Sequence, residues 1–154
     1  MRRWVALLLT AVLLFTAGCA KKETGLNVDA ATAADRLMSA IHFTDQMSAI
    51  EEKTALKLYG LDQNSVSKLK VYESTGATAE EIAVFEAKDV EAAAKIGEAA
   101  QKRIENQREG FQDYQPQEMV KLKNPILETF GNYVVLCVSN DNTAAQKAID
   151  GLKR

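Results

Sequence analysis

The chain has 154 residues, of which 47% are hydrophobic and 26% are charged, close to the shares of an average globular domain. These shares exclude a disordered acidic tail and a collagen-like repeat. The 19 basic and 21 acidic residues give a net charge of -2, which leaves no basic surplus for nucleic acid, and two Cys and one His cannot supply an ordinary Cys/His zinc site. We therefore expect no nucleic-acid partner and no cofactor.

The first 18 residues have the pattern of an export signal. Arg2 and Arg3 precede an uninterrupted run of apolar residues and Thr over residues 4–17. A membrane-spanning helix needs about 20 apolar residues. The shorter run therefore favours a signal-peptide core over a membrane anchor that is never cleaved.

The end of this run, Thr16-Ala17-Gly18-Cys19, resembles the bacterial lipobox, although Thr16 stands where that pattern usually has Leu. The resemblance implies cleavage after residues 1–18 and a diacylglycerol on Cys19, with a plain secretory cut nearby as the alternative. Two acyl chains anchor a protein stably, because each buried methylene contributes about 0.8 kcal/mol. We expect a lipid-anchored protein on the extracytoplasmic face of the cell membrane, with residues 19–28 as a lipidated tether.

Residues 29–154 are expected to form a single domain that begins with two helices. Asp29 is a typical N-cap residue, and apolar residues recur at helical spacing from Ala30 to Ile41. A short strand or extended link is expected over residues 42–47. A second, short helix is expected over residues 51–59, ended by Gly60.

A first hairpin is predicted next. Residues 66–74 alternate, with Leu69 and Val71 on one face and lysines on the other, and residues 81–87 return as a second strand after a turn. Alternation with a polar side is typical of an antiparallel sheet that has one face in water.

The longest helix is predicted over residues 90–113, capped by Asp89 and ended by Tyr114-Gln115-Pro116. Its small residues should let it lie close to the sheet, and we interpret the region of Arg103, Gln107 and Arg108 as a solvent-exposed helix face. The expected buried stripe consists of Val90, Ala93, Gly97, Ala100, Ile104 and Phe111.

A second hairpin and a last helix complete the prediction. Residues 126–130 and 133–138 flank Gly131-Asn132, a two-residue turn signal. Residues 133–138 are apolar on both faces and are the candidate for the central strand. Asp141 or Asn142 should cap the last helix. The fold class is therefore α+β: a mostly antiparallel sheet of two hairpins packed against a long central helix, with N- and C-terminal helices.

Several short motifs resemble one known family from about Phe43 to Leu152. It is the domain-of-unknown-function family 4358, a family of uncharacterised bacterial lipoproteins. The resemblance implies a location and a fold, and it assigns no functional residue. The matching motifs are Leu58-Tyr59-Gly60, Glu80-Glu81-Ile82-Ala83-Val84-Phe85, Arg103-Ile104-Glu105-Asn106-Gln107 with Phe111 and Tyr114-Gln115-Pro116, and Gly131-Asn132-Tyr133-Val134.

Few residues have the chemistry of a site. His42 has no nucleophile or elbow motif beside it and is expected to cap carbonyls or lie in solvent. Cys137, inside an apolar strand, is expected to be a buried and inert thiol. Glu80 and Glu81 should point to opposite faces and serve as edge charges that discourage strand addition, although Glu73 on the partner strand could approach one of them.

The aromatic residues favour a core over a ligand-binding cleft. If a binding groove exists, its weak candidate residues are Tyr59, Glu81 and Tyr114. We expect a non-enzymatic binding or accessory module of the cell envelope, with an envelope protein as a possible partner. The alternatives are a small-ligand-binding protein or an enzyme with an unrecognised site, for which a deep pocket with convergent polar groups would be the evidence, and an inhibitor-like module that inserts a hairpin into a partner.

Overall fold

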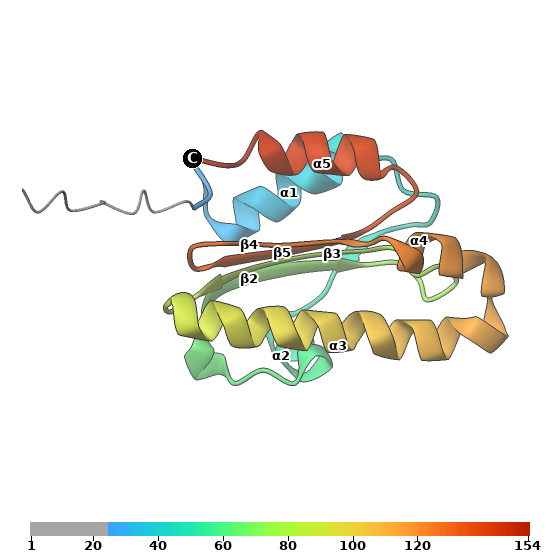
Figure 1. The fold of residues 1–154 in the computed structure, drawn as a ribbon, viewed down its shortest axis with the longest axis horizontal. Helices are drawn as coiled ribbons and strands as arrows, with labels where there is room; N and C mark the ends of the chain where they lie inside the picture. The colour runs from blue at the N-terminus through green and yellow to red at the C-terminus, as the bar shows by residue number, and fades with distance from the viewer. Residues whose placement is uncertain (1–24) are drawn as a thin grey trace, which may run out of the picture.

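The computed structural model describes residues 25–154, so the predicted signal peptide and the lipidation site Cys19 lie outside the described residues. The elements follow the predicted order (Figure 1). They are α1 (Ala30–Ala40), β1 (Ser48–Ala49), α2 (Glu52–Tyr59), η1 (Gln63–Ser65), β2 (Val66–Glu73), β3 (Glu81–Ala87), α3 (Val90–Tyr114), η2 (Pro116–Glu118), α4 (Met119–Lys123), β4 (Ile126–Phe130), β5 (Tyr133–Val138) and α5 (Asn142–Asp150).

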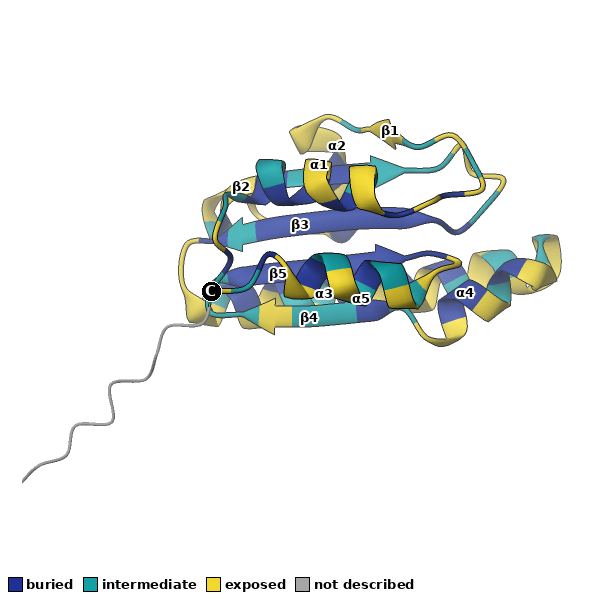
Figure 2. Cartoon of the chain, turned by 90° about the horizontal axis from the view of Figure 1, so that it is seen from above, coloured by how far each residue is buried: buried dark blue, intermediate teal, exposed yellow. Residues whose placement is uncertain are grey.

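The strands form one antiparallel sheet in the order β1-β2-β3-β5-β4, with helices on both faces (Figure 1). Helices α1 and α5 cover one face, and α2 and α3 cover the other. One hydrophobic core therefore lies on each side of the sheet. The predicted α+β class with a long helix is confirmed. The expectation of a water-exposed sheet face is wrong, because the terminal helices bury the second face of β3 and β5 (Figure 2).

The predicted helix N-caps and the predicted glycine positions are confirmed. Asp29, Asp89 and Asp141 each accept a hydrogen bond from a backbone N–H in the first turn of their helix, which satisfies otherwise unpaired donors. Gly60 ends α2 with a φ of +64°, and Gly131 turns the second hairpin with a φ of +58°, conformations that glycine adopts without strain. Local chemistry therefore defines most element boundaries.

Strand β5 is the apolar strand predicted for the centre of the sheet. It lies between β3 and β4, and each of its six residues is buried. The middle position belongs to β3, because β1 adds a short fifth strand beside β2. Cys137 is fully buried in β5, and desolvation raises the pKa of its thiol to about 12, as expected of an unreactive cysteine.

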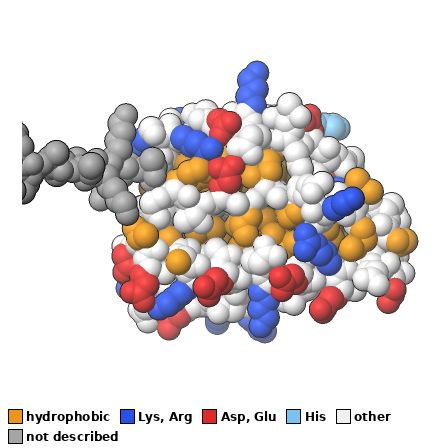
Figure 3. Space-filling model, viewed as in Figure 1, with side chains coloured by type: hydrophobic (Ala, Val, Ile, Leu, Met, Phe, Trp, Pro, Cys, Tyr) orange, Lys and Arg blue, Asp and Glu red, His pale blue; other side chains and the backbone are white. Residues whose placement is uncertain are grey.

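The buried stripe of α3 differs in part from the prediction. Val90 is 66% exposed, so the stripe begins one turn later than expected. Gly97 is only half-buried, and a Cβ there would meet Thr129 at an ordinary 3.6 Å, so packing does not require a glycine. The fully or nearly buried residues of α3 are Ala93, Ile96, Ala100, Ile104 and Gln107. On the outer face of the helix, acidic and basic side chains are interspersed (Figure 3).

Enlarging Ala100 should destabilise the fold. Ala100 has no exposed surface, and overpacking a filled core costs about 1–3 kcal/mol. We expect Ala100→Leu to lower the thermal midpoint of the full-length protein in detergent clearly, whereas Gln101→Leu, one residue along on the exposed side, should change stability by less than about 0.5 kcal/mol. Equal small shifts in the two variants would contradict close packing of α3 on the sheet.

The folded part of the chain begins before Asp29. Leu26, assigned by sequence to the tether, is fully buried and forms a β-bridge with Lys153. The N–H of Asn27 donates to the carbonyl of Leu152 at 2.8 Å, and the N–H of Arg154 donates to that of Gly25 at 2.9 Å. The first and last described residues thus lie side by side at one end of the domain (Figure 1).

Candidate functional site

Glu80 and Glu81 stand at the start of β3 and are 1% and 0% exposed. Their interpretation as edge charges is wrong, because β3 is the middle strand and Glu81 lies opposite both Glu73 of β2 and Val138 of β5. Successive strand residues point to opposite faces. As a result, the two carboxylates enter separate polar clusters on the two sides of the sheet.

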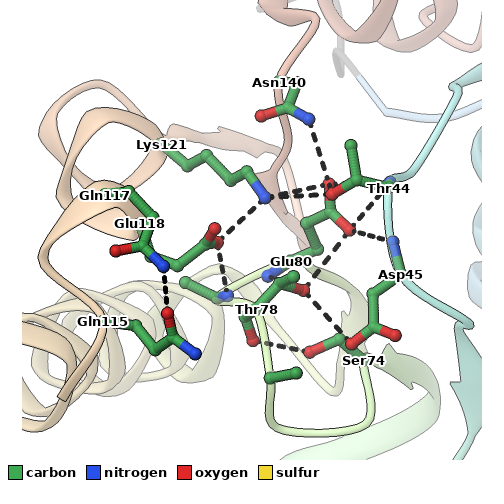
Figure 4. A network of polar contacts seen from close by, with 12 residues as sticks. Thr44, Asp45, Ser74, Thr78, Glu80, Gln115, Gln117, Glu118, Lys121 and Asn140 are labelled. Atoms are coloured by element: carbon green, nitrogen blue, oxygen red, sulfur yellow. Dashed lines mark hydrogen bonds and ion pairs between the residues drawn. The ribbon is translucent and has the colours of Figure 1, made fainter.

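Glu80 is the centre of the first cluster (Figure 4). Its carboxylate accepts hydrogen bonds from the backbone N–H groups of Thr44 and Asp45 at 3.0 and 2.9 Å and from the Thr44 hydroxyl at 2.8 Å. Burial acts to raise the pKa of Glu80, but these donors and Lys121 outweigh it and lower the pKa below its usual value. The carboxylate is therefore held in its charged form.

Lys121 of α4 completes this first cluster, which we call the Glu80–Lys121 cluster. Its ammonium lies 3.2 Å from Glu80 and 2.9 Å from Glu118, and its side chain is 7% exposed. Glu118 also accepts the backbone N–H of Ala79 at 2.9 Å. The cluster thus joins the segment after α1, the β2–β3 turn and α4 (Figure 4), and each ion has a partner. These contacts indicate a structural role.

Glu81 is the centre of the second cluster, on the α3 side of the sheet. Tyr59, at the end of α2, donates its hydroxyl to Glu81 Oε1, and the amide Nε2 of Gln107 donates to Oε2 at 2.8 Å. The Arg103 Nε donates to the same oxygen at 3.1 Å. The predicted pair Tyr59 and Glu81 therefore meets directly, in a fully buried contact.

Arg103 connects Glu81 to Glu73. Its Nη2 lies 3.0 Å from Glu81 Oε2 and 2.8 Å from Glu73 Oε1, which confirms that Glu73 approaches one of the two glutamates. The interpretation of Arg103, Gln107 and Arg108 as a solvent-exposed face is wrong. Arg103 is largely buried in these ion pairs, Gln107 is 7% exposed, and Arg108 donates to the backbone carbonyl of Leu122 at 2.7 and 2.9 Å.

In the second cluster, the pKa values of Glu73, Tyr59 and Arg103 are all raised. Burial and the neighbouring charge of Glu81 raise the pKa of Glu73, and Arg103 offsets this only in part. Burial, followed by the charge of Glu81, raises the pKa of Tyr59 well above its usual value, so the phenol stays a hydrogen-bond donor. Desolvation acts to lower the pKa of Arg103, but Glu81, Glu73 and Tyr59 together outweigh it, so the pKa is raised and Arg103 is charged.

A cavity of about 310 Å³ opens onto this second cluster. We call it the Glu81 cleft. Most of its lining residues belong to the β2–β3 turn and to the C-terminal half of α3. These two segments lie at the end of the domain opposite the C-terminus (Figures 1 and 2). The lining residues of the cleft are Glu73, Ser74, Gly76, Thr78, Glu80, Glu81, Arg103, Asn106, Gln107, Gly110, Phe111 and Tyr114.

Two of the three candidate residues predicted from the sequence, Tyr59, Glu81 and Tyr114, line the cleft. Glu81 and Tyr114 line the cleft, and Tyr59 lies behind it, bonded to Glu81 and packed edge-to-face on Phe85 at 4.9 Å. Tyr114 is 69% exposed, so the expectation that the tyrosines form the core is wrong for this residue, which follows the last buried turn of α3.

Gln107 has one unsatisfied atom. Its Nε2 is bonded to Glu81, while its Oε1 is buried without a hydrogen-bond partner among residues 25–154. Sequence reasoning missed Gln107 and Arg103 because polar residues on a helix usually face water. Gln107 nevertheless follows Ile104 by three residues and Ala100 by seven, which is the spacing of the buried stripe.

The remaining candidate features are His42, a metal site and a membrane-spanning helix. His42 is exposed, as expected. Within residues 25–154 there is no group of three His, Cys, Asp or Glu residues arranged to hold a metal ion. Over the same range, none of the helices has the length and hydropathy needed to cross a membrane.

The comparison with protein-family models matches residues 39–139 to the domain of unknown function DUF4358. The chain belongs to this family. The DUF4358 match includes the sheet, α2, α3 and all lining residues of the Glu81 cleft, whereas nearly all of α1 and the whole of α5 lie outside it. No curated protein and no solved structure was found to be similar to the chain.

Proposed function

We propose that the protein is a membrane-anchored extracytoplasmic lipoprotein whose DUF4358 domain binds a small ligand, or a side chain of an envelope partner, in the Glu81 cleft. The observation that carries the proposal is the convergence of Glu73, Arg103 and Gln107 on buried Glu81 at the base of a cavity. Concave sites with a few fixed polar groups are typical of ligand binding.

Binding without catalysis fits the state of the cleft carboxylate. Both oxygens of Glu81 accept hydrogen bonds from fixed side chains, and its side chain is 1% exposed. A general base must reach the proton that it removes. Glu81 instead orients Arg103 and Gln107, which form the wall of the cleft. We therefore propose a non-enzymatic binding module.

The position of the cleft is compatible with a lipid anchor at Cys19. An extended chain covers at most about 3.6 Å per residue, so residues 19–24 would keep the domain within a few nanometres of the bilayer. The β2–β3 turn and the end of α3, which line the cleft, lie at the end of the domain away from the paired chain ends (Figure 1). A tether there would leave the cleft open to the envelope space.

Ligand binding in the cleft is tested by filling it. A Cβ at Gly110 would meet nothing within 4 Å, so Gly110→Leu can extend into the cleft without strain. We expect a small-molecule fragment library to contain compounds that shift the NMR signals of Gly76 and the Gln107 side-chain amide in the full-length protein in detergent, and Gly110→Leu to abolish these shifts. Ala94→Leu, on the exposed side of α3, is the matched control and should leave them unchanged. A library without any cleft-binding compound would refute the proposal.

Anchoring is tested separately at Cys19. The motive is the short apolar run ending in Thr16-Ala17-Gly18-Cys19. We expect Cys19→Ser to abolish acyl labelling and either to release the protein from the membrane fraction or to leave the precursor uncut. The matched change Cys137→Ser, at the buried cysteine, should leave labelling intact. Normal processing and acylation of Cys19→Ser would disprove the lipid anchor.

A further inference from the structure

We propose that the Glu81 cleft is specific for an organic cation, a primary alkylammonium group whose charge pairs with Glu73 and whose aliphatic stem lies along Phe111 and Tyr114. This inference rests on the proposed function, because it names the class of ligand that the same cleft takes.

The first argument is the charge of the cleft wall. Among the charged lining residues, Glu80 is paired with Lys121. Glu73 and Glu81 contribute two further carboxylates and Arg103 contributes one guanidinium, so this group of three carries one net negative charge. Glu81 is sealed, with a side chain that is 1% exposed, whereas that of Glu73 is 26% exposed and lines the cavity. Arg103 engages Oε1 of Glu73, which leaves Oε2 for a further donor. A monovalent cation at Glu73 would neutralise the group.

The second argument is the unsatisfied acceptor on Gln107. A buried acceptor without a partner is destabilising, and most such atoms in native proteins have a partner. The Gln107 Oε1 has none among the described residues, and Gln107 lines the same cavity as Glu73. An ammonium group has three donors and no acceptor. One ligand group can therefore bond the carboxylate of Glu73 and, once the Gln107 amide turns its buried oxygen toward the cavity, that oxygen as well.

The third argument is the aromatic wall. The Phe111 and Tyr114 rings lie 6.5 Å apart at an interplanar angle of 51°, and both residues line the cavity at the end of α3. Ring faces attract cations and pack against aliphatic chains. A metal ion fits the site less well, because the Arg103 guanidinium already lies between the two carboxylates and would repel a divalent ion.

Three probes of equal length, one cationic, one neutral and one anionic, test which ligand charge the cleft prefers. Butylamine, butanol and butyrate are titrated into the full-length protein in detergent, and the NMR signals of Gly76, Gly110 and the Gln107 side-chain amide report on the cleft, with Gly60 as a distant reference. We expect butylamine at neutral pH to shift the cleft signals, and butanol and butyrate to bind at least tenfold more weakly. Glu73→Gln should weaken butylamine binding by about tenfold or more, the usual effect of losing a charge-assisted hydrogen bond. Glu98→Gln removes the same charge at an exposed position of α3 and should have no effect on butylamine binding.

The outcomes separate this inference from the proposed function. Equal or tighter binding of butanol or butyrate, or unchanged butylamine binding in Glu73→Gln, overturns the specificity for a cation and leaves the cleft as a binding site. If none of the three probes shifts the cleft signals while other fragments do, the inference is also wrong. If no compound of any charge binds, both fail together.

Discussion

Lys121→Met should lower the free energy of unfolding by about 3–5 kcal/mol, the usual cost of removing one partner from a buried ion pair. The ammonium of Lys121 lies within 3.2 Å of Glu80 and 2.9 Å of Glu118, and both carboxylates are nearly buried. Methionine has a similar length but no charge, so two negative charges would stay close together in a poorly hydrated site. Denaturant unfolding of the full-length protein in detergent measures the loss.

The matched control is Lys123→Met, at an exposed position of the same short helix, which should change stability by less than about 0.5 kcal/mol. The pH dependence adds an independent readout. Because the pKa of Glu80 is lowered in the folded state, its contribution to stability is present above its unfolded value near 4.5 and is lost as the pH falls below it. The difference between Lys121→Met and the unchanged protein should therefore narrow in acid. A constant difference would argue against the ion pair as its source.

Arg103→Met should have a comparable effect, again about 3–5 kcal/mol, on the other side of the sheet. Without the guanidinium, Glu81 is a buried carboxylate whose charge faces Glu73 across the β2–β3 pair. The second change Glu81→Gln removes that buried charge, so the double variant should recover part of the stability. The neighbouring Lys102→Met, exposed on α3, serves as the control. If the double variant is no more stable than Arg103→Met alone, the loss comes from packing.

Much of the fold could be predicted because its signals are local. Asp29, Asp89 and Asp141 are N-caps by their own side-chain chemistry, and Gly60 and Gly131 occupy positions with positive φ. Each of these residues acts on its immediate neighbours in sequence. The elements and their order therefore follow from the sequence to within a few residues.

The coverage of the sheet and the composition of the cleft depend on contacts between distant segments. Helices α1 and α5 bury the second face of the sheet from opposite ends of the chain. The sequence around Arg103 and Gln107 predicts surface residues, because their partner Glu81 lies 22 and 26 residues earlier in the chain. A buried carboxylate and its donors satisfy one another, and a sequence pattern that considers one element at a time assigns each of them to solvent.

The pairing of the two chain ends has a mechanical consequence. If the protein is held at its N-terminus, a pull on the domain is transmitted through residues 25–27, of which Gly25 and Asn27 are hydrogen-bonded to Arg154 and Leu152. The load would reach this short bridge and the neighbouring ends of α1 and α5 first. The β2–β3 turn and the end of α3 lie at the opposite end, outside the path of the force (Figure 1). If the proposed anchor at Cys19 holds the protein, a movement of the envelope loads the paired chain ends and leaves the geometry of the cleft unchanged.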